Sequence, residues 1–150
     1  MNWIKINDKF TVGDQPTEEQ LHELANQGFT SVVNLRTSGE PNAPFAPEQE
    51  GDKVEGLGMK YVHFPVSMQA MNDRIIDEFR MKVKELPEPV FVHCASGKRA
   101  GAITMMHCAI VDGMTGKETL EQAEKLGFKT DIPQLAEFIR TYVDRHSHPD

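Results

Sequence analysis

The chain has 150 residues, of which 39% are hydrophobic and 26% are charged, and this length fits one domain that buries its own core. Sixteen basic and 23 acidic residues give a formal net charge of −7, which argues against a dedicated surface for nucleic acid or for an anionic membrane. No apolar run approaches the ~20 residues of a membrane span, and Met1–Lys5 does not resemble the start of a secretory signal. The only cysteines are Cys94 and Cys108, too few for a disulfide framework. We therefore expect a cytoplasmic protein whose thiols stay reduced.

Strands and helices alternate in the first half of the chain. Short apolar runs predict strands, and Thr17 with Gln20 forms a capping box before an apolar stripe. The stretch from Arg36 to Pro47 holds three prolines and one glycine, so we expect a long loop, and such loops are often functional. In chain order the predicted elements are strands at 3–6 and 10–12, a helix from Thr17 to Gly28, a strand at 31–35, a helix at 47–57 and a strand at 60–66.

The second half is predicted to be mostly helical around one buried strand. Val90–Val92 is a continuous apolar run, typical of a central strand that is covered on both faces. In chain order we expect a helix from Asn72 to just before Pro87, the strand Val90–Val92, a helix ending near Gly113, a helix capped by Thr115 with Glu118, a last helix opened by Asp131 with Pro133, and a frayed tail at Arg145–Asp150. This order predicts a single α/β domain over residues 1–150, with a mostly parallel central sheet flanked by helices and a helix-rich C-terminal third.

The segment between Val92 and the next helix carries the residues of chemical interest. Backbone N–H groups at the start of a helix, together with the helix dipole, favour a bound anion, and small residues let the loop curl around it. The same field favours a thiolate at Cys94, and Arg99 can hold two oxygens of a phosphate. The expected anion-binding loop consists of His93, Ala95, Ser96, Gly97, Lys98 and Arg99. These parts predict a nucleophile, an oxyanion cradle and a charge clamp.

At these residues the sequence resembles the protein tyrosine and dual-specificity phosphatase superfamily, whose signature is His-Cys, a glycine-containing loop and Arg. It is most similar to small bacterial phosphatase-like proteins that also occur fused to β-lactamase-like hydrolases. The supporting stretches are Val12–Thr17, Gly28–Arg36, Tyr61–Val66 and the loop His93–Arg99. The resemblance implies a metal-independent phosphomonoester hydrolase with no cofactor, in which the Cys94 thiolate attacks phosphorus and water hydrolyses the resulting thiophosphate. It also implies a phosphorylated protein or small molecule as substrate, and phosphate, sulfate or vanadate as an active-site anion.

The sequence departs from the superfamily pattern at two places. Four residues rather than five separate Cys94 from Arg99, so we expect Arg99 to act as the clamp in a shorter loop. The position of the general acid in relatives falls near Ser67 or Met68, and the nearest acid downstream is Asp73. We expect Asp73 to be the acid, although the first turn of a helix favours acidic residues for structural reasons alone. Two residues of the long loop are further candidates for a supporting role: Glu40, as an alternative acid, and Arg36, which could equally form a salt bridge with Glu40.

Two other functions stay open at this point. A rhodanese-type sulfurtransferase also uses a Cys-loop of this shorter length at the end of a strand, although His93 and the placement of Arg99 argue against it. A non-catalytic phosphate-binding pseudophosphatase would keep Cys94 and Arg99 but lack an effective acid. A metal site is not expected, because no further Cys or His lies at ligand spacing from the pair His107-Cys108. Cys108 is therefore expected to be structural.

Overall fold

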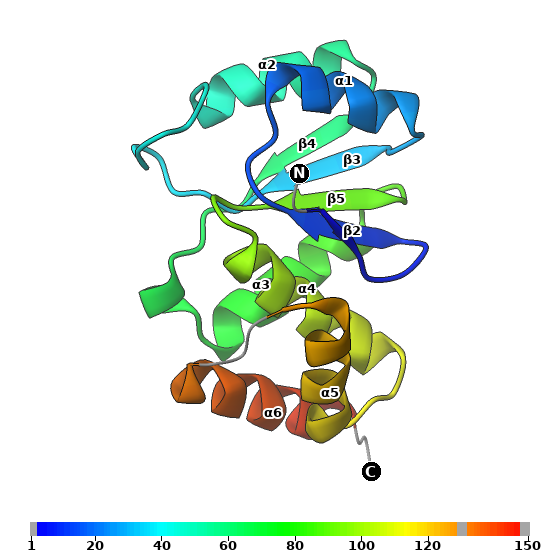
Figure 1. Cartoon of the computed structure of the whole chain (residues 1–150), viewed down its shortest axis with the longest axis vertical. Helices are drawn as coiled ribbons and strands as arrows, with labels where there is room; N and C mark the ends of the chain where they lie inside the picture. Colours follow the sequence, from blue (N-terminus) through cyan, green and yellow to red (C-terminus); the bar gives the residue numbers. More distant parts are fainter. Residues whose placement is uncertain (1–2, 129–131, 148–150) are drawn as a thin grey trace. The chain divides into compact units, whose positions relative to one another are not determined.

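The computed structural model describes residues 3–128 and 132–147. It divides into two compact units, residues 1–100 and residues 101–150. The first unit contains a five-stranded sheet in the order β1-β2-β5-β3-β4 (Figure 1). Only β1 runs antiparallel to its neighbour, so the expected mostly parallel α/β sheet is confirmed. The strands are β1 (Ile4–Lys5), β2 (Phe10–Gly13), β3 (Ser31–Asn34), β4 (Lys60–His63) and β5 (Val90–His93).

The central strand is β5, which lies between β2 and β3 and runs parallel to both. His93 at its end pairs with Gly13 of β2 and with Asn34 of β3. All four residues of β5 are buried, as the apolar run predicts. Because β2, β5 and β3 are parallel and end at the same edge of the sheet, the segments that follow them meet there. This edge holds the predicted site.

The helices of the first unit bury apolar side chains against the sheet. The helices α1 (Glu18–Asn26) and α2 (Pro47–Gly56) lie side by side on one face (Figure 1). Their contribution to the core on this face is Leu21, Leu24 and Val54, packed with Val32 and Phe91 of the sheet. The other helices of this unit are the short 3₁₀ helix η1 (Met68–Ala70) and α3 (Asp73–Lys84).

Local sequence signals set most of the helix boundaries. Thr17 caps α1 through the predicted box with Gln20, and the Asn72 side chain accepts a hydrogen bond from the Ile75 N–H at the start of α3. The predicted helix at 47–57 is confirmed despite Gly51, which packs against the Tyr61 ring so closely that a Cβ would lie 2.9 Å from Cδ2. The strand predicted at 60–66 is shorter and ends at His63. Pro65 has no N–H to donate, but Phe64 and Val66 still donate to backbone carbonyls at the end of β3, each at 2.9 Å.

The helix-rich C-terminal third is also confirmed. It contains α4 (Lys98–Val111), which begins at the end of the first unit, α5 (Gly116–Leu126) and α6 (Pro133–Ser147). The helices α5 and α6 pack closely, since Gly116 contacts the Arg140 backbone and its N–H donates to the Asp144 Oδ1 at 2.7 Å.

The structure tests the prediction for the C-terminal end of α6 but not the one for its opening residue. The predicted opening residue Asp131 lies outside the described residues. At the other end the sequence predicts fraying over 145–150. The helix nevertheless continues to Ser147, so residues 145–147 are helical. Residues 148–150 lie outside the described part. That residues 1–150 form one domain stays a prediction. Among the described residues, no helix combines the length and apolar character that a membrane crossing requires.

Candidate active site

The loop between β5 and α4 curls around the sulfur of Cys94. The thiol is fully buried, and its Sγ accepts hydrogen bonds from the N–H of Gly97 at 3.1 Å and from that of Ala100 at 3.4 Å. Gly97 has a φ of 97°, a left-handed conformation that favours glycine. Ala95 and Ser96 are exposed. The small residues of the loop therefore allow backbone donors to converge on a buried thiol.

The segment after β2 supports this loop from the side. The Gly13 carbonyl accepts a hydrogen bond from the Cys94 N–H at 3.3 Å, and the Gln15 N–H donates to the Ala95 carbonyl at 3.3 Å. A Cβ on Gly97 would lie 3.5 Å from the Gly13 carbonyl carbon. The loop after Cys94 thus packs against the backbone of residues 13–15, and little space separates the two.

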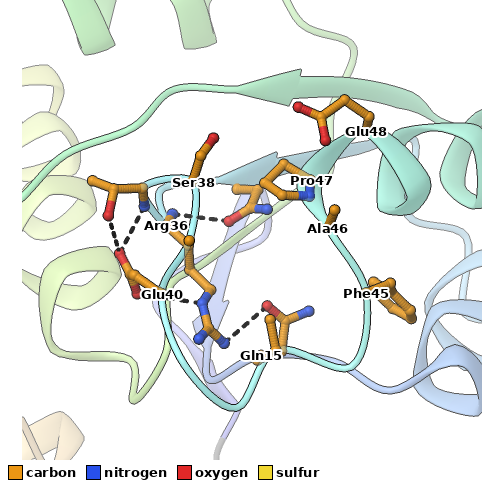
Figure 2. A pocket seen from close by; sticks show the side chains of 12 residues that line it. Gln15, Arg36, Ser38, Glu40, Phe45, Ala46, Pro47 and Glu48 are labelled. Carbon is orange, nitrogen blue, oxygen red and sulfur yellow. Dashed lines mark hydrogen bonds and ion pairs between the residues drawn. The ribbon is translucent and has the colours of Figure 1, made fainter.

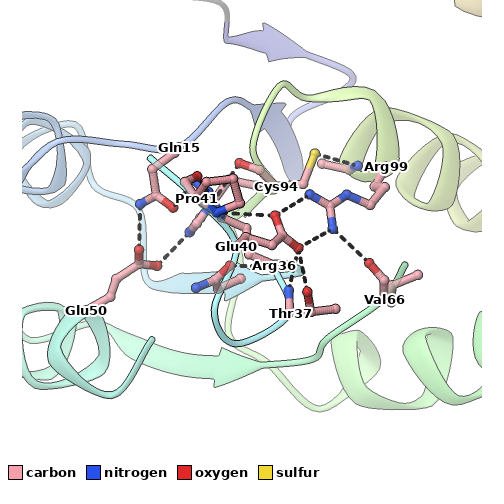
Figure 3. A network of polar contacts seen from close by, with 12 residues as sticks. Gln15, Arg36, Thr37, Glu40, Pro41, Glu50, Val66, Cys94 and Arg99 are labelled. Atoms are coloured by element: carbon pink, nitrogen blue, oxygen red, sulfur yellow. Dashed lines mark hydrogen bonds and ion pairs between the residues drawn. The ribbon is translucent and has the colours of Figure 1, made fainter. Parts of the chain in front are cut away.

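Arg99, the predicted clamp, reaches back from the first turn of α4 and binds a carboxylate. Its Nη1 and Nη2 donate to the two oxygens of Glu40 at 2.8 and 2.9 Å, and Nη1 also donates to the Val66 carbonyl at 3.0 Å (Figure 3). The hydrogen bond with Glu40 raises the pKa of Arg99, and the nearby Cys94 adds to this effect. The guanidinium is therefore held beside Cys94 in a fixed orientation.

Glu40 is held as an anion by the donors around it. Hydrogen bonds from Arg99 lower its pKa from 4.5 to about 2, against the opposing effect of burial, and the Thr37 N–H and hydroxyl add further donors. A carboxyl that stays ionised down to this pH carries no proton to donate. The geometry consequently argues against Glu40 as the general acid and gives it the role of partner to Arg99.

The Arg36–Glu40 salt bridge that the sequence allows is present. Arg36 is buried, and its Nε lies 3.3 Å from the Glu40 Oε1. Its other nitrogens donate to the Pro41 carbonyl at 2.7 Å and to the Gln15 Oε1 at 3.2 Å. Arg36 thereby ties the long loop to the end of β2.

A second carboxylate, which the sequence analysis did not select, lies under His93. The His93 Nε2 is 2.6 Å from the Glu50 Oε2, and both side chains are almost completely buried. Gln15 donates to the other oxygen of Glu50 at 2.7 Å (Figure 3). A sequence signal for Glu50 existed, because it precedes Val54 by one helical turn and so lies on the inward face of α2.

A pocket of about 330 Å³ opens beside this network (Figure 2). Gln15, Arg36 and Glu40 belong to its polar wall, and Phe45 adds an apolar ring. The start of α2 forms another part of the wall, through Ala46, Pro47 and Glu48.

The proposed acid and the remaining loop residues have the following positions. Asp73 is the first residue of α3 and is half-buried, in the helix-start position that the sequence predicts. Ser67 caps η1 through its side chain, and Lys98 is exposed at the start of α4. The contacts above join His93, Cys94, Arg99, Glu40 and Arg36 into one region, whereas the catalytic role of Asp73 stays a prediction. Within the described part of the chain, no three His, Cys, Asp or Glu side chains gather in a way that suits a metal ion.

Solved structures with low sequence identity share this fold. Tk-PTP, solved in its active form, is 19% identical with a TM-score of 0.79 and aligns over 96% of this chain and 97% of its own. TpbA from P. aeruginosa, solved in complex with pTyr, is 15% identical with a TM-score of 0.77 over 97% of this chain and 88% of its own.

Closer similarity in sequence identifies the family. A beta-lactamase hydrolase-like protein of Agrobacterium fabrum is 32% identical over 125 residues, which is 83% of this chain but only 29% of that protein. The family model described as a DSP-PTPase phosphatase fused to NAD+ kinase matches residues 4–140. The resemblance inferred from the Cys-loop is thereby confirmed, and the chain belongs to this family of dual-specificity-type phosphatases.

Proposed function

We propose that this chain is a cysteine-dependent phosphomonoester hydrolase with Cys94 as its nucleophile. The observation that carries the proposal is the pair of N–H donors, from Gly97 and Ala100, that point at the Cys94 Sγ at the start of α4. Such donors stabilise negative charge on sulfur. Membership in a phosphatase family supports the same chemistry and disfavours the sulfurtransferase alternative.

In the proposed reaction the Cys94 thiolate attacks the phosphorus of a phosphomonoester. The S–P bond forms as the bond to the leaving oxygen breaks, and we assign Asp73 to protonate that oxygen. Water then attacks phosphorus and gives a proton to the Asp73 carboxylate, the S–P bond breaks, and inorganic phosphate leaves as the Cys94 thiolate is regenerated. Arg99 stabilises the charge on the transferring group, because its guanidinium already lies beside Cys94. No metal is needed for either step.

The exposed side chains of the loop after Cys94 bear on the kind of substrate that can bind. Ala95, Ser96 and Lys98 are exposed on it, which favours a shallow site for a phosphorylated protein or small molecule, with phosphate, sulfate or vanadate as competing anions. Because the nucleophile must stay reduced, we place the activity in the cytoplasm.

The test is hydrolysis of p-nitrophenyl phosphate in the presence of EDTA. We expect Cys94→Ser to abolish turnover, Arg99→Lys to lower it strongly and Asp73→Asn to lower it by about 10²–10⁴-fold. Cys108→Ala is the matched control, since it removes the other buried thiol and should retain activity. Turnover that survives Cys94→Ser would refute the mechanism, and full activity of Asp73→Asn would remove Asp73 from it. Transfer of sulfur from thiosulfate without phosphatase activity would refute the proposed function.

A further inference from the structure

The buried contact between His93 and Glu50 has no role in the chemistry described so far. The two side chains are 0% and 1% exposed, and 2.6 Å separates Nε2 from Oε2. A buried charge is costly unless a partner and hydrogen bonds compensate it. Because His93 directly precedes Cys94 in the chain, this contact lies next to the proposed nucleophile.

Glu50 has a hydrogen-bond partner on each carboxyl oxygen. Its Oε1 accepts a hydrogen bond from the Gln15 amide nitrogen at 2.7 Å, and its Oε2 faces the His93 ring. The orientation of the Gln15 amide is fixed, because its oxygen accepts from the Arg36 guanidinium at 3.2 Å and its nitrogen also donates to the Pro16 carbonyl. The Oε1 is thus an acceptor, and Oε2 shares one proton with the His93 Nε2.

Both ring nitrogens of His93 also have a partner. The Nε2 faces the Glu50 carboxyl group, and the Nδ1 faces the Cys94 carbonyl oxygen at 3.4 Å. With an ionised Glu50, an imidazolium that donates from both nitrogens satisfies this arrangement.

Other titratable groups face this pair from the neighbouring elements. Burial, and next the charge of Glu50, raise the pKa of the Tyr61 hydroxyl on β4, so that group stays neutral. Arg36, after β3, reaches Glu50 through Gln15, and Arg99, on α4, faces Cys94. Within these surroundings Glu50 is the carboxyl group in direct contact with His93.

We propose that Glu50 is a positioning residue that keeps His93 as an imidazolium directly before Cys94, and that this buried charge helps to hold Cys94 as the reactive thiolate. The inference rests on the proposed function only in taking Cys94 as the nucleophile. The contacts of Glu50 continue through Gln15, Arg36 and Glu40 to Arg99 (Figure 3). Glu50 is therefore also connected to the clamp, although it touches neither substrate nor sulfur.

The first measurement is made on the wild-type protein, with both His93 and Glu50 in place. Nitrogen-15 NMR of the histidine rings in the wild-type protein reports how many protons His93 carries, with assignment by a His93→Gln variant. We expect both ring nitrogens to be protonated at pH 7. A neutral ring at that pH would overturn the proposal, even if the Glu50 variants fail to fold.

The second measurement is the rate at which iodoacetamide alkylates Cys94, followed against pH in a Cys108→Ala background. In Glu50→Gln we expect the midpoint of thiolate formation to rise by about one pH unit, so that alkylation below the midpoint slows about tenfold. The matched control is Glu55→Gln, which removes an exposed carboxylate from the same helix and should leave the midpoint unchanged. An unchanged midpoint in folded Glu50→Gln, or an equal shift in Glu55→Gln, would overturn the proposal. Neither readout depends on phosphatase turnover, so failure of the proposed function would be seen separately.

Discussion

Replacing Glu40 by Gln should destabilise the protein in a way that depends on pH. The substitution keeps the size of the side chain and removes the charge that pairs with Arg99. The pKa of Glu40 falls from 4.5 to about 2 in the folded protein, which corresponds to about 3 kcal/mol. Because the Glu40 and Arg99 side chains are 19% and 14% exposed and solvent screens the pair, we expect about 1–2 kcal/mol at pH 7.

The sign of the pH dependence follows from the lowered pKa. The folded state binds the Glu40 proton more weakly than the unfolded state, so the stabilisation is complete above pH 4.5 and is lost as the pH falls toward 2. Urea unfolding followed by circular dichroism should show a gap between wild type and Glu40→Gln that narrows by about half between pH 7 and pH 3.

An exposed ion pair provides the control for this experiment. Glu137 pairs with Arg140 on the surface of α6, and Glu137→Gln should change stability little at either pH. Equal stabilities of wild type and Glu40→Gln at pH 7 would refute the reasoning. So would a gap that stays constant down to pH 3, because the loss would then not come from the charge.

Three further predictions concern the loop, the core and the thiol. Gly97→Ala forces alanine into a φ of 97°, so it should lower the free energy of unfolding by about 1–3 kcal/mol and weaken vanadate binding. The control is Gly58→Ala, at a φ of 88° in open surroundings, which should lower stability but leave the vanadate affinity intact. Equal vanadate affinities in the two variants would contradict this prediction. Phe79→Ala removes a fully buried ring that packs edge-on to Phe64 and should lower the free energy of unfolding by about 3–5 kcal/mol in urea titrations. Peroxide should inactivate the enzyme by oxidising Cys94, and a thiol reductant should restore activity; inactivation with Cys94 still unmodified, as judged by mass spectrometry, would contradict this.

The parts of the fold that depend on neighbouring residues were predictable from the sequence. The capping boxes at Thr17 and Thr115 form as expected, since each needs contacts within one helical turn. The buried strand Val90–Val92 was also recognisable, because an apolar run of this kind suits the centre of a parallel sheet. The strand at 60–66 was predicted too long, since apolar character continues after the ladder ends at His63.

The candidate site was recognisable where it is contiguous in the chain. The loop from Cys94 to Arg99 contains a cysteine, a glycine and an arginine within six residues, so one stretch of sequence was enough to predict an anion site, and this site stays a prediction. The partners of this loop come from other strands and helices. Glu50 and Gln15 contact the region only because β5 is flanked by β2 and β3, and periodicity alone does not reveal which distant side chains meet. For the same reason, the salt bridge between Arg99 and Glu40 could not be inferred from a motif.

The position of β5 in the sheet also has a consequence for the order of events during synthesis. Phe10 pairs with Val90, and Ser31 pairs with the same residue on the other side, so neither β2 nor β3 acquires this neighbour until residue 90 has left the ribosome. Pairings between such distant segments form slowly. The backbone that surrounds the Cys94 sulfur follows directly after this strand. In a nascent or partly folded chain the N–H groups of Gly97 and Ala100 therefore do not yet point at the Cys94 sulfur, and this arrangement arises only once the sheet is complete.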